Sequence, residues 1–441
     1  MNTNVSIITL GCSKNTVDSE KLAGILKSAG YEITFESLKN ADIAIVNTCG
    51  FILDAKEESI ETILDCAKIK NDKRYKLSKL YVFGCLVERN KEELKEAIPE
   101  VDEWFGANEY ELLSKSILKD VEVADSKCVK RLLSTPEHYA YLKVAEGCNK
   151  KCAFCAIPII RGKHVSSTKE NILAEAKFLF DKGVKEVMLI SQDLTYYGID
   201  LYKTMELRDL TQKIADIGFP WIRLHYAHPN EINEEIFRMY NEIPSLCKYL
   251  DIPLQHISTS ILKNMKRNID KEGTIALVKR IRKIVPDIAI RTAFIVGFPG
   301  ETEEDFEELV EFVRESRFDR VGVFTFSSEE GTAAAEMIDD VPEEVKQSRM
   351  ERLLEVQQSI SLEKNLEKVG DTMKVIIDSK EDNYYIGRTE FDSPEVDNEV
   401  IVFSDNDLII GEFYDALITD ADYFDLIGEV LVKMSATANK K

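Results

Sequence analysis

Short apolar runs alternate with helical repeats along most of the chain. The run Val5–Leu10 precedes a helical pattern at Val17–Ala29, and the run Ala41–Val46 precedes another at Glu57–Ile69. Strands that are apolar along their whole length are typical of parallel sheets covered on both faces by helices. The alternation therefore predicts an α/β fold built on parallel sheets.

The N-terminal unit contains a third strand pattern at Leu80–Phe83, followed by a helical pattern at Lys91–Ala97. We therefore expect an open parallel α/β sheet domain over residues 1–125, with a connector at residues 126–136.

The middle of the chain repeats the alternation in six β/α units, at a length too short for a closed eight-stranded barrel of about 250 residues. A partial (βα)6 barrel is predicted, with its domain at residues 134–368. Its strands are expected at Tyr141–Ala145, Glu186–Ser191, Trp221–His225, Tyr249–Pro253, Ala289–Val296 and Val321–Phe326.

After Gly370 the pattern changes to short β-type runs separated by turn residues. This pattern is typical of a small β-barrel, here five-stranded, and predicts a third domain at residues 369–441. The five strands are expected at Met373–Ile377, Tyr384–Gly387, Val400–Phe403, Asp407–Phe413 and Glu429–Lys433.

Composition limits where the protein works and what it binds. The 441 residues carry 57 Lys and Arg against 79 Asp and Glu, a net charge of −22, which disfavours non-specific binding to nucleic acid or anionic membranes. The N-terminus lacks the basic segment of a signal peptide, and no run approaches the ~18–20 apolar residues of a membrane helix. We expect a cytoplasmic protein with no membrane partner.

Three cysteines form a tight local motif, Cys148-x3-Cys152-x2-Cys155, just after the first strand of the expected barrel. Three thiolates at this spacing can ligate one iron–sulfur cluster and leave one iron open. A zinc site completed by His164 is one alternative, and cysteines that only pack or form a redox dithiol are another.

A second group is dispersed along the N-terminal domain. Cys12, Cys49 and Cys85 are spaced 37 and 36 residues apart, and each follows an expected parallel strand. The carboxyl ends of such strands share one edge of the sheet, where ligands bind, so these thiols are candidates for a second cluster. The alternative is three separately buried thiols. Cys66, Cys128 and Cys247 are interpreted as packing residues.

The chain resembles the radical S-adenosylmethionine (SAM) methylthiotransferases over essentially its whole length. The Cys148, Cys152 and Cys155 motif on a six-unit barrel is similar to the radical SAM superfamily. The N-terminal domain with its three cysteines and the C-terminal barrel, similar to a TRAM domain, resemble the methylthiotransferases. Gly11-Cys-Ser-Lys-Asn15 and Ser191-Gln-Asp-Leu-Thr-Tyr-Tyr-Gly-Ile-Asp200 resemble the RimO branch, and the tRNA-modifying branch usually has Gln-Met at Ser13-Lys14.

This resemblance implies two 4Fe–4S clusters and SAM as cofactors. Cys148, Cys152 and Cys155 would ligate the cluster that cleaves SAM to a 5′-deoxyadenosyl radical, and Cys12, Cys49 and Cys85 the cluster that carries the transferred sulfur. The cysteine-rich loop is also basic, through Lys150, Lys151, Arg161 and Lys163, which either offset the cluster charge or form a solvated surface.

Four residues resemble the superfamily's SAM contacts. Gln192 and Asp193 follow the second barrel strand and match the contacts to the methionine moiety. Gly297 and Pro299 match the strand end that contacts adenine. The alternative is that they only form a turn before a helix whose N-cap is Thr302. His225 and His228 are expected to be structural. No residue is assigned a catalytic role.

The RimO branch modifies an aspartate of the basic small-subunit ribosomal protein number twelve, so that protein is the expected substrate. From Asp371 to Lys441 there are six Lys and Arg against seventeen Asp and Glu, a net charge of −11 that disfavours RNA. A sulfur donor and a reductant protein are also expected as partners. The alternatives are a tRNA adenosine methylthiotransferase and a non-catalytic, metal-dependent binding module.

Overall fold

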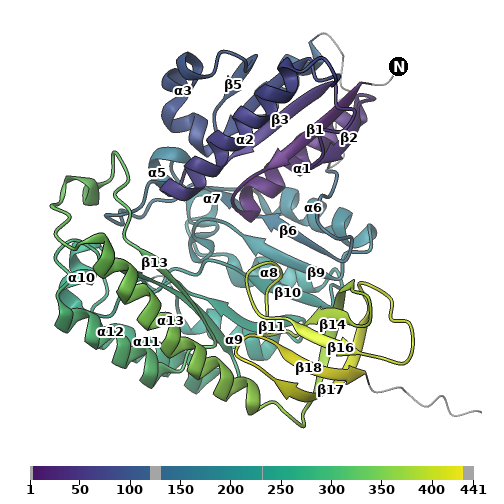
Figure 1. Ribbon diagram of the computed structural model, residues 1–441. Coiled ribbons are helices and arrows are strands. Elements are labelled where there is room, and N and C mark those ends of the chain that lie inside the picture. The colour runs from purple at the N-terminus through teal and green to yellow at the C-terminus, as the bar shows by residue number, and fades with distance from the viewer. Residues whose placement is uncertain (1–2, 120–130, 231, 431–441) are drawn as a thin grey trace, which may run out of the picture.

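Three domains follow one another along the chain and stack into one particle (Figure 1). The computed structural model describes residues 3–119, 131–230 and 232–430. None of the helices in these residues combines the length and apolarity needed to span a bilayer. Part of the expected connector at 126–136, with Cys128, lies outside the described residues.

The N-terminal domain is a five-stranded parallel sheet in the order β2-β1-β3-β4-β5. Three strands were expected, and the structure adds the short edge strands β2 and β5. Its strands are β1 (Asn4–Thr9), β2 (Glu32–Phe35), β3 (Ile43–Thr48), β4 (Lys79–Gly84) and β5 (Glu103–Phe105). Its helices are α1 (Ser13–Ser28), α2 (Leu53–Asn71), α3 (Cys85–Ala97) and α4 (Tyr110–Leu118).

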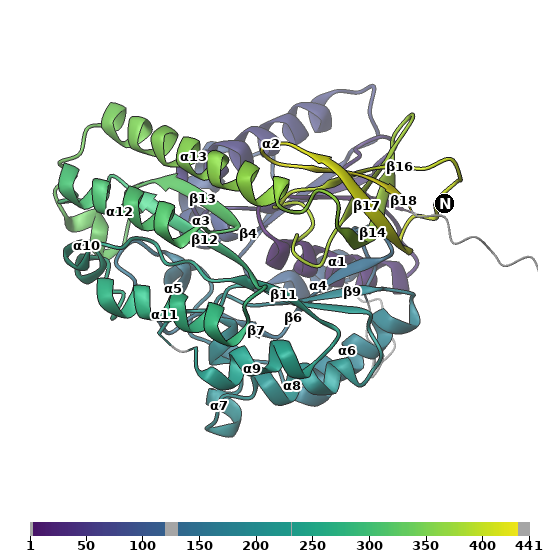
Figure 2. The ribbon, with the colours of Figure 1, turned by 90° about the horizontal axis from the view of Figure 1, so that it is seen from below.

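The central domain is an open sheet of six parallel strands in the order β13-β12-β11-β10-β9-β6, which confirms the six expected strands. They are β6 (Tyr139–Lys143), β9 (Glu186–Ile190), β10 (Trp221–Leu224), β11 (Leu246–Asp251), β12 (Ala289–Val296) and β13 (Arg320–Thr325). The outer face carries α6 (Lys169–Asp181), α8 (Leu207–Ala215), α9 (Glu234–Glu242), α11 (Lys271–Ile284) and α12 (Glu303–Ser316), as Figure 2 shows from below.

Short elements and one long helix complete this domain. They are β7 (Ala145–Glu146), α5 (Ile157–Ile160), β8 (Val165–Ser166), η1 (Leu194–Tyr196), α7 (Ile199–Tyr202), α10 (Thr259–Asn264), η2 (Ala333–Glu336) and α13 (Glu343–Leu366). Helix α13 packs along β13 and α12, with Leu353 and Ile360 in the main core. The largest core of the molecule lies between the sheet and its outer helices.

The C-terminal domain is the expected closed five-stranded barrel, in the order β14-β15-β16-β18-β17. Its strands are β14 (Thr372–Lys380), β15 (Tyr385–Arg388), β16 (Val400–Phe403), β17 (Phe413–Ala421) and β18 (Leu426–Val430). The strand expected at Asp407–Phe413 is wrong, because Gly411 has a φ of +81° and turns the chain there. Ile409 and Ile410, which suggested that strand, are 66% and 51% exposed.

The loop between β15 and β16 enters the concave face of the central sheet, and we name residues 389–399 the plug loop. Ser393 bonds His225 at 3.0 Å, and Glu395 accepts hydrogen bonds from Tyr139 at 3.1 Å and Tyr141 at 2.8 Å. Asp397 accepts one from the Tyr249 hydroxyl at 2.6 Å. The barrel is therefore fixed to the central domain through polar contacts deep in the sheet.

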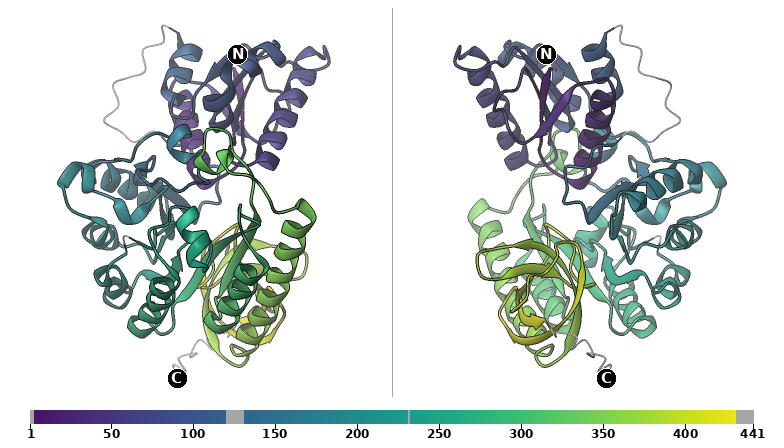
Figure 3. Two further views of the ribbon diagram at one scale, coloured as in Figure 1. Left: turned by 90° about the vertical axis from the view of Figure 1, so that its left-hand side faces the viewer. Right: turned by 90° about the vertical axis from the view of Figure 1, so that its right-hand side faces the viewer.

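The N-terminal domain covers the carboxyl ends of the central strands (Figure 3). Val17 of α1 packs in one cluster with Tyr139, Tyr141, Met188 and Ile190 of the concave face. The cysteine-bearing edge of the first sheet consequently faces the end of the second sheet at which a (βα) barrel carries its active site.

Candidate active site: two groups of three cysteines

The first group, the N-terminal cysteine trio, is Cys12, Cys49 and Cys85. Cys12 caps the start of α1, Cys49 follows β3 and Cys85 begins α3, so all three lie at the carboxyl ends of neighbouring strands. Gly11, at a φ of +91°, lies so close to the next loop that an added Cβ would be 2.9 Å from the Cys49 sulfur. The close approach of these loops brings the trio together.

Asn15 joins the three loops of this trio, a role that we did not expect from the sequence. Its Nδ2 donates to the Leu10 carbonyl at 2.7 Å and to the Thr48 carbonyl at 3.1 Å, and its Oδ1 accepts a weak bond from the Cys85 thiol at 3.8 Å. Asn15 is fully buried. One side chain thus fixes the spacing of the loops that follow β1, β3 and β4.

The electrostatics of this trio reflect burial and the closeness of the thiols to one another. Burial raises the pKa of Cys85 to about 12 and also raises the pKa of Cys49. In each case Cys12 raises the pKa further, whereas the nearby Arg161 guanidinium lowers it. Binding to a metal centre favours the thiolate form, which buried free thiols resist.

Arg161 belongs to the basic loop that was expected to surround the barrel cysteines. In the structure its side chain reaches the N-terminal trio instead. Its guanidinium donates to Asp18 at 2.8 Å and Glu146 at 3.3 Å, and it also bonds Asn15. Lys143 pairs with the same two carboxylates. This buried network joins the two domains directly beside the trio.

The second group, the barrel cysteine trio, is Cys148, Cys152 and Cys155, in the loop between β7 and α5. Burial raises the pKa of Cys155 to about 12, and the charges of the other two thiols raise it further. All three therefore lie close enough to interact electrostatically.

Two donors already point at sulfur atoms of the barrel trio. The Lys150 backbone N–H donates to the Cys148 sulfur at 3.4 Å, and the Arg267 guanidinium donates to the Cys152 sulfur at 3.4 Å. Arg267 is held by the Pro253 carbonyl at 2.6 Å. Its role was not expected, because it is far from the cysteine motif in the sequence.

The zinc alternative gains no support. The His164 Nε2 bonds the Ser166 hydroxyl at 3.0 Å. Within residues 3–119, 131–230 and 232–430, no group of three or more His, Cys, Asp and Glu side chains is arranged to hold a single metal ion. An iron–sulfur cluster is larger than one ion and holds its thiolate ligands further apart.

The expected methionine contacts, Gln192 and Asp193, lie beside the barrel trio. Gln192 donates to Glu146 at 2.5 Å, and its buried Oε1 has no hydrogen-bond partner. Asp193 lies 3.6 Å from the Lys150 ammonium. Burial is the main cause of the raised pKa of Cys148, and the charge of Asp193 raises it further. An unpaired buried acceptor next to the thiols is what a bound polar ligand would satisfy.

The expected adenine contacts, Gly297 and Pro299, are buried at the end of β12. An added Cβ on Gly297 would meet the Lys346 side chain at 2.2 Å, so packing alone requires a glycine there. Phe298 between them packs in one cluster with Ala153 of the cysteine loop. The helix cap expected from the alternative explanation is present, since Thr302 forms a capping box with Asp305.

His225 and His228 both have lowered pKa values, as expected of structural histidines. Burial and then Arg223 depress the pKa of His225, and burial and then Arg267 lower the pKa of His228 to about 2. Both imidazoles are therefore neutral at physiological pH. Cys66 and Cys247 are buried in the cores, also as expected.

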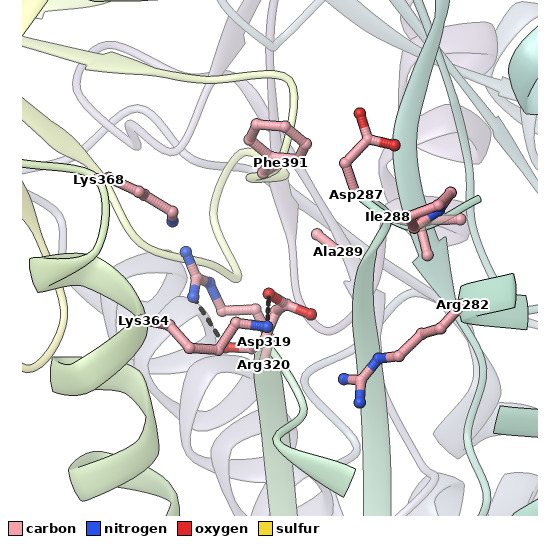
Figure 4. A pocket seen from close by; sticks show the side chains of 10 residues that line it. Arg282, Asp287, Ile288, Ala289, Asp319, Arg320, Lys364, Lys368 and Phe391 are labelled. Carbon is pink, nitrogen blue, oxygen red and sulfur yellow. Dashed lines mark hydrogen bonds and ion pairs between the residues drawn. The ribbon is translucent and has the colours of Figure 1, made fainter. Parts of the chain in front are cut away.

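A pocket of about 190 Å³ lies at the opposite end of the central strands (Figure 4). It is lined by residues at the starts of β12 and β13, such as Ala289 and Arg320, and by Lys364, Lys368 and Phe391. Both cysteine trios are at the other ends of their strands, so this pocket is separate from the candidate site.

Three family models match the three domains. The model described as uncharacterized protein family UPF0004 matches residues 4–106, the radical SAM superfamily matches 142–313 and the TRAM domain matches 369–431. Among solved structures, the radical SAM methyltransferase TsrM from Kitasatospora setae has a TM-score of 0.56 at 13% identity, covering 84% of this chain and 79% of its own. The likeness to TsrM shows a shared fold.

Curated relatives match nearly the whole chain. The ribosomal protein uS12 methylthiotransferase RimO of Bacteroides fragilis is 53% identical over 433 residues, which cover 97% of this chain and 99% of the relative. The protein of the same name from Cytophaga hutchinsonii is 48% identical, with 97% and 98% covered. The chain therefore belongs to the RimO family of ribosomal protein uS12 methylthiotransferases.

Proposed function

We propose that the chain is a transferase that adds a methylthio group to the β-carbon of an aspartate in ribosomal protein uS12. Its radical SAM domain implies a 4Fe–4S cluster and SAM as cofactors. The observation that carries the proposal is the packing of Cys85, in the N-terminal trio, in one cluster with Ala156, which follows Cys155 of the barrel trio. This packing occurs in a chain that is 53% identical to a uS12 methylthiotransferase.

We infer that each trio ligates one 4Fe–4S cluster, so that the enzyme holds two. Each trio offers three soft thiolate ligands, the donor type that iron–sulfur clusters use. The bound clusters supply an electron for cleaving SAM and the sulfur that is transferred. Arg267 and the Lys150 N–H stabilise negative charge on the barrel trio, and Arg161 does so at the N-terminal trio.

SAM is proposed to bind at the barrel trio. Gln192 and Asp193 contact its methionine moiety, and the backbone at Gly297 and Pro299 contacts its adenine. The unpaired Gln192 Oε1 supports the first contact. For the second, support is limited to the closeness of Phe298 to the cysteine loop, because the Lys346 side chain already occupies the space above Gly297.

Two further partners are required by this chemistry: a sulfur donor and a reductant protein. Cys12 is exposed, whereas Cys85 is buried. The exposed side of the N-terminal trio gives an external sulfur donor a route to that centre. Because the substrate is a ribosomal protein, we place the reaction in the cytoplasm.

The acidic C-terminal domain favours a basic protein over tRNA as the substrate. Part of its negative charge is neutralised inside the molecule, as at Asp392, which pairs with Arg320. Other carboxylates, including Asp382, Asp405 and Asp422, are exposed. An exposed acidic surface attracts a basic protein and repels RNA phosphates.

We propose domain boundaries at 1–125, 134–368 and 369–441, which enclose the three matched segments.

The proposal is tested by incubating the anaerobically reconstituted enzyme with SAM, sulfide and a reductant, together with either uS12 or tRNA. Mass spectrometry should find a methylthio group on an aspartate of uS12 and none on tRNA. Modification of tRNA alone would overturn the proposal.

A further inference from the structure

Lys14 is a buried cation without an acidic partner at the interface of the N-terminal and central domains. It lies in the first turn of α1, two residues after Cys12, and is 5% exposed. In the part of the chain that the structure describes, its ammonium forms no hydrogen bond or ion pair; its one polar contact is with the Tyr226 ring, whose centroid lies 3.2 Å away. The Lys14 Nζ is not among the fully buried polar atoms that lack a partner, so a ligand can reach the ammonium. Charges in such an enclosed position are normally paired.

Tyr226 itself has a strained backbone. Its φ is +65°, an uncommon value for a bulky aromatic residue. The Asp251 carboxylate accepts its N–H at 3.1 Å, and its carbonyl accepts from the Leu194 N–H at 3.0 Å, so the surrounding structure enforces this conformation. Strain of this kind is found at functional sites, where it positions a side chain.

The pair Lys14 and Tyr226 is linked to both cysteine trios. Lys14 is next in the chain to the Cys12 loop, and Tyr226 follows β10 at the carboxyl end of the central sheet. Two residues beyond Tyr226, His228 bonds Arg267 at 3.0 Å, and Arg267 donates to the Cys152 sulfur. The pair therefore connects the loop of one trio with residues that contact the other.

The other cation close to Tyr226 is already neutralised. Arg291 forms ion pairs with Asp251 at 3.2 Å and Asp397 at 3.3 Å. Lys14 therefore provides the positive charge that a ligand can still neutralise. An ammonium group has three donors and no acceptor, so the ligand group that suits it is an anion.

We infer that the Lys14 ammonium binds the carboxylate of the substrate aspartate and so selects aspartate over asparagine. This inference rests on the proposed function, in which the modified β-carbon of the substrate aspartate is bonded directly to the carboxylate carbon. Holding that carboxylate between the trios positions the β-carbon for the reaction. Asparagine, which has the same shape and no charge, would leave the ammonium unpaired.

The test compares binding of uS12 and of uS12 with its target aspartate replaced by asparagine. The wild-type holoenzyme with SAM should bind the aspartate form about 10- to 100-fold more tightly, as expected for a hydrogen bond between charged groups. Lys14→Met removes the ammonium, keeps the unbranched part of the side chain and should bind both forms equally. Lys14→Arg should retain a preference for aspartate.

Lys182→Met is the matched control, because Lys182 also lies over an aromatic ring, Phe178 at 5.7 Å, but on the outer surface. It should bind like the wild type. If Lys14→Met weakens both forms alike and keeps the wild-type preference, the lysine only joins the domains and the inference is wrong. If the wild type does not methylthiolate uS12 at all, the proposed function fails instead. Iron content and cluster absorbance report whether each variant is intact.

Discussion

Replacing Arg161 with methionine removes the cation that joins the N-terminal and central domains beside the first trio. The Arg161 side chain is buried and bonds Asp18, Glu146 and Asn15. Removing one partner of a buried ion pair typically costs 3–5 kcal/mol. Because Lys143 still pairs with both carboxylates, we expect a loss at the lower end, about 3 kcal/mol.

Urea unfolding of the cluster-free protein at pH 7, followed by circular dichroism, measures this loss as a lower midpoint of the transition. Lys163→Met is the control, since Lys163 lies two residues away in the same loop and is exposed. If Arg161→Met unfolds within about 0.5 kcal/mol of the wild type, the size expected of an ordinary surface substitution, the network does not hold the domains together.

The two trios should also have separate functions. Cys152→Ala should abolish formation of 5′-deoxyadenosine from SAM, measured by chromatography. Cys49→Ala should leave that product measurable and stop methylthio transfer, measured by mass spectrometry. Loss of 5′-deoxyadenosine in both variants, with the barrel cluster intact, would mean that these roles are divided wrongly. The contribution of Asp378 to the free energy of unfolding should depend on pH. Burial alone raises the pKa of Asp378, but the nearby Arg388 and His138 lower it more, so that it lies below its ordinary value. Its stabilisation is therefore complete above a pH of about 4 and lost as the pH falls through the lower folded pKa. Asp378→Asn should lower the free energy of unfolding by about 2 kcal/mol at pH 7, and in urea titrations this difference should shrink below a pH of about 4.

Much of the fold follows from local sequence patterns. Strands such as β3, β6 and β9 are apolar runs whose burial on both faces leaves a clear signal. The short edge strands β2 and β5 have a weaker signal, because they are partly exposed. At Asp407–Phe413 the apolar residues Ile409 and Ile410 are exposed to solvent, so the hydrophobic pattern predicted a strand where the chain turns.

The polar residues around the site could not be predicted in the same way. Arg161 and Asn15 are 146 residues apart, and Arg267 and Cys152 are 115 residues apart. No local periodicity connects such pairs, since the packing of two domains brings the first pair together and the fold of the central domain brings the second together. The plug loop is a similar case: its acidic residues contribute to the net charge of the sequence, but several are paired inside the molecule.

The central claim is that the chain holds one iron–sulfur cluster on each cysteine trio, and the iron and acid-labile sulfide of anaerobically reconstituted protein test it most directly. The wild type should contain about eight irons and eight sulfides per chain, and Cys85→Ala and Cys155→Ala about four of each. Cys66→Ala, which removes a buried packing thiol, should retain about eight. A wild-type content of about four irons, or zinc in place of iron, would contradict the account.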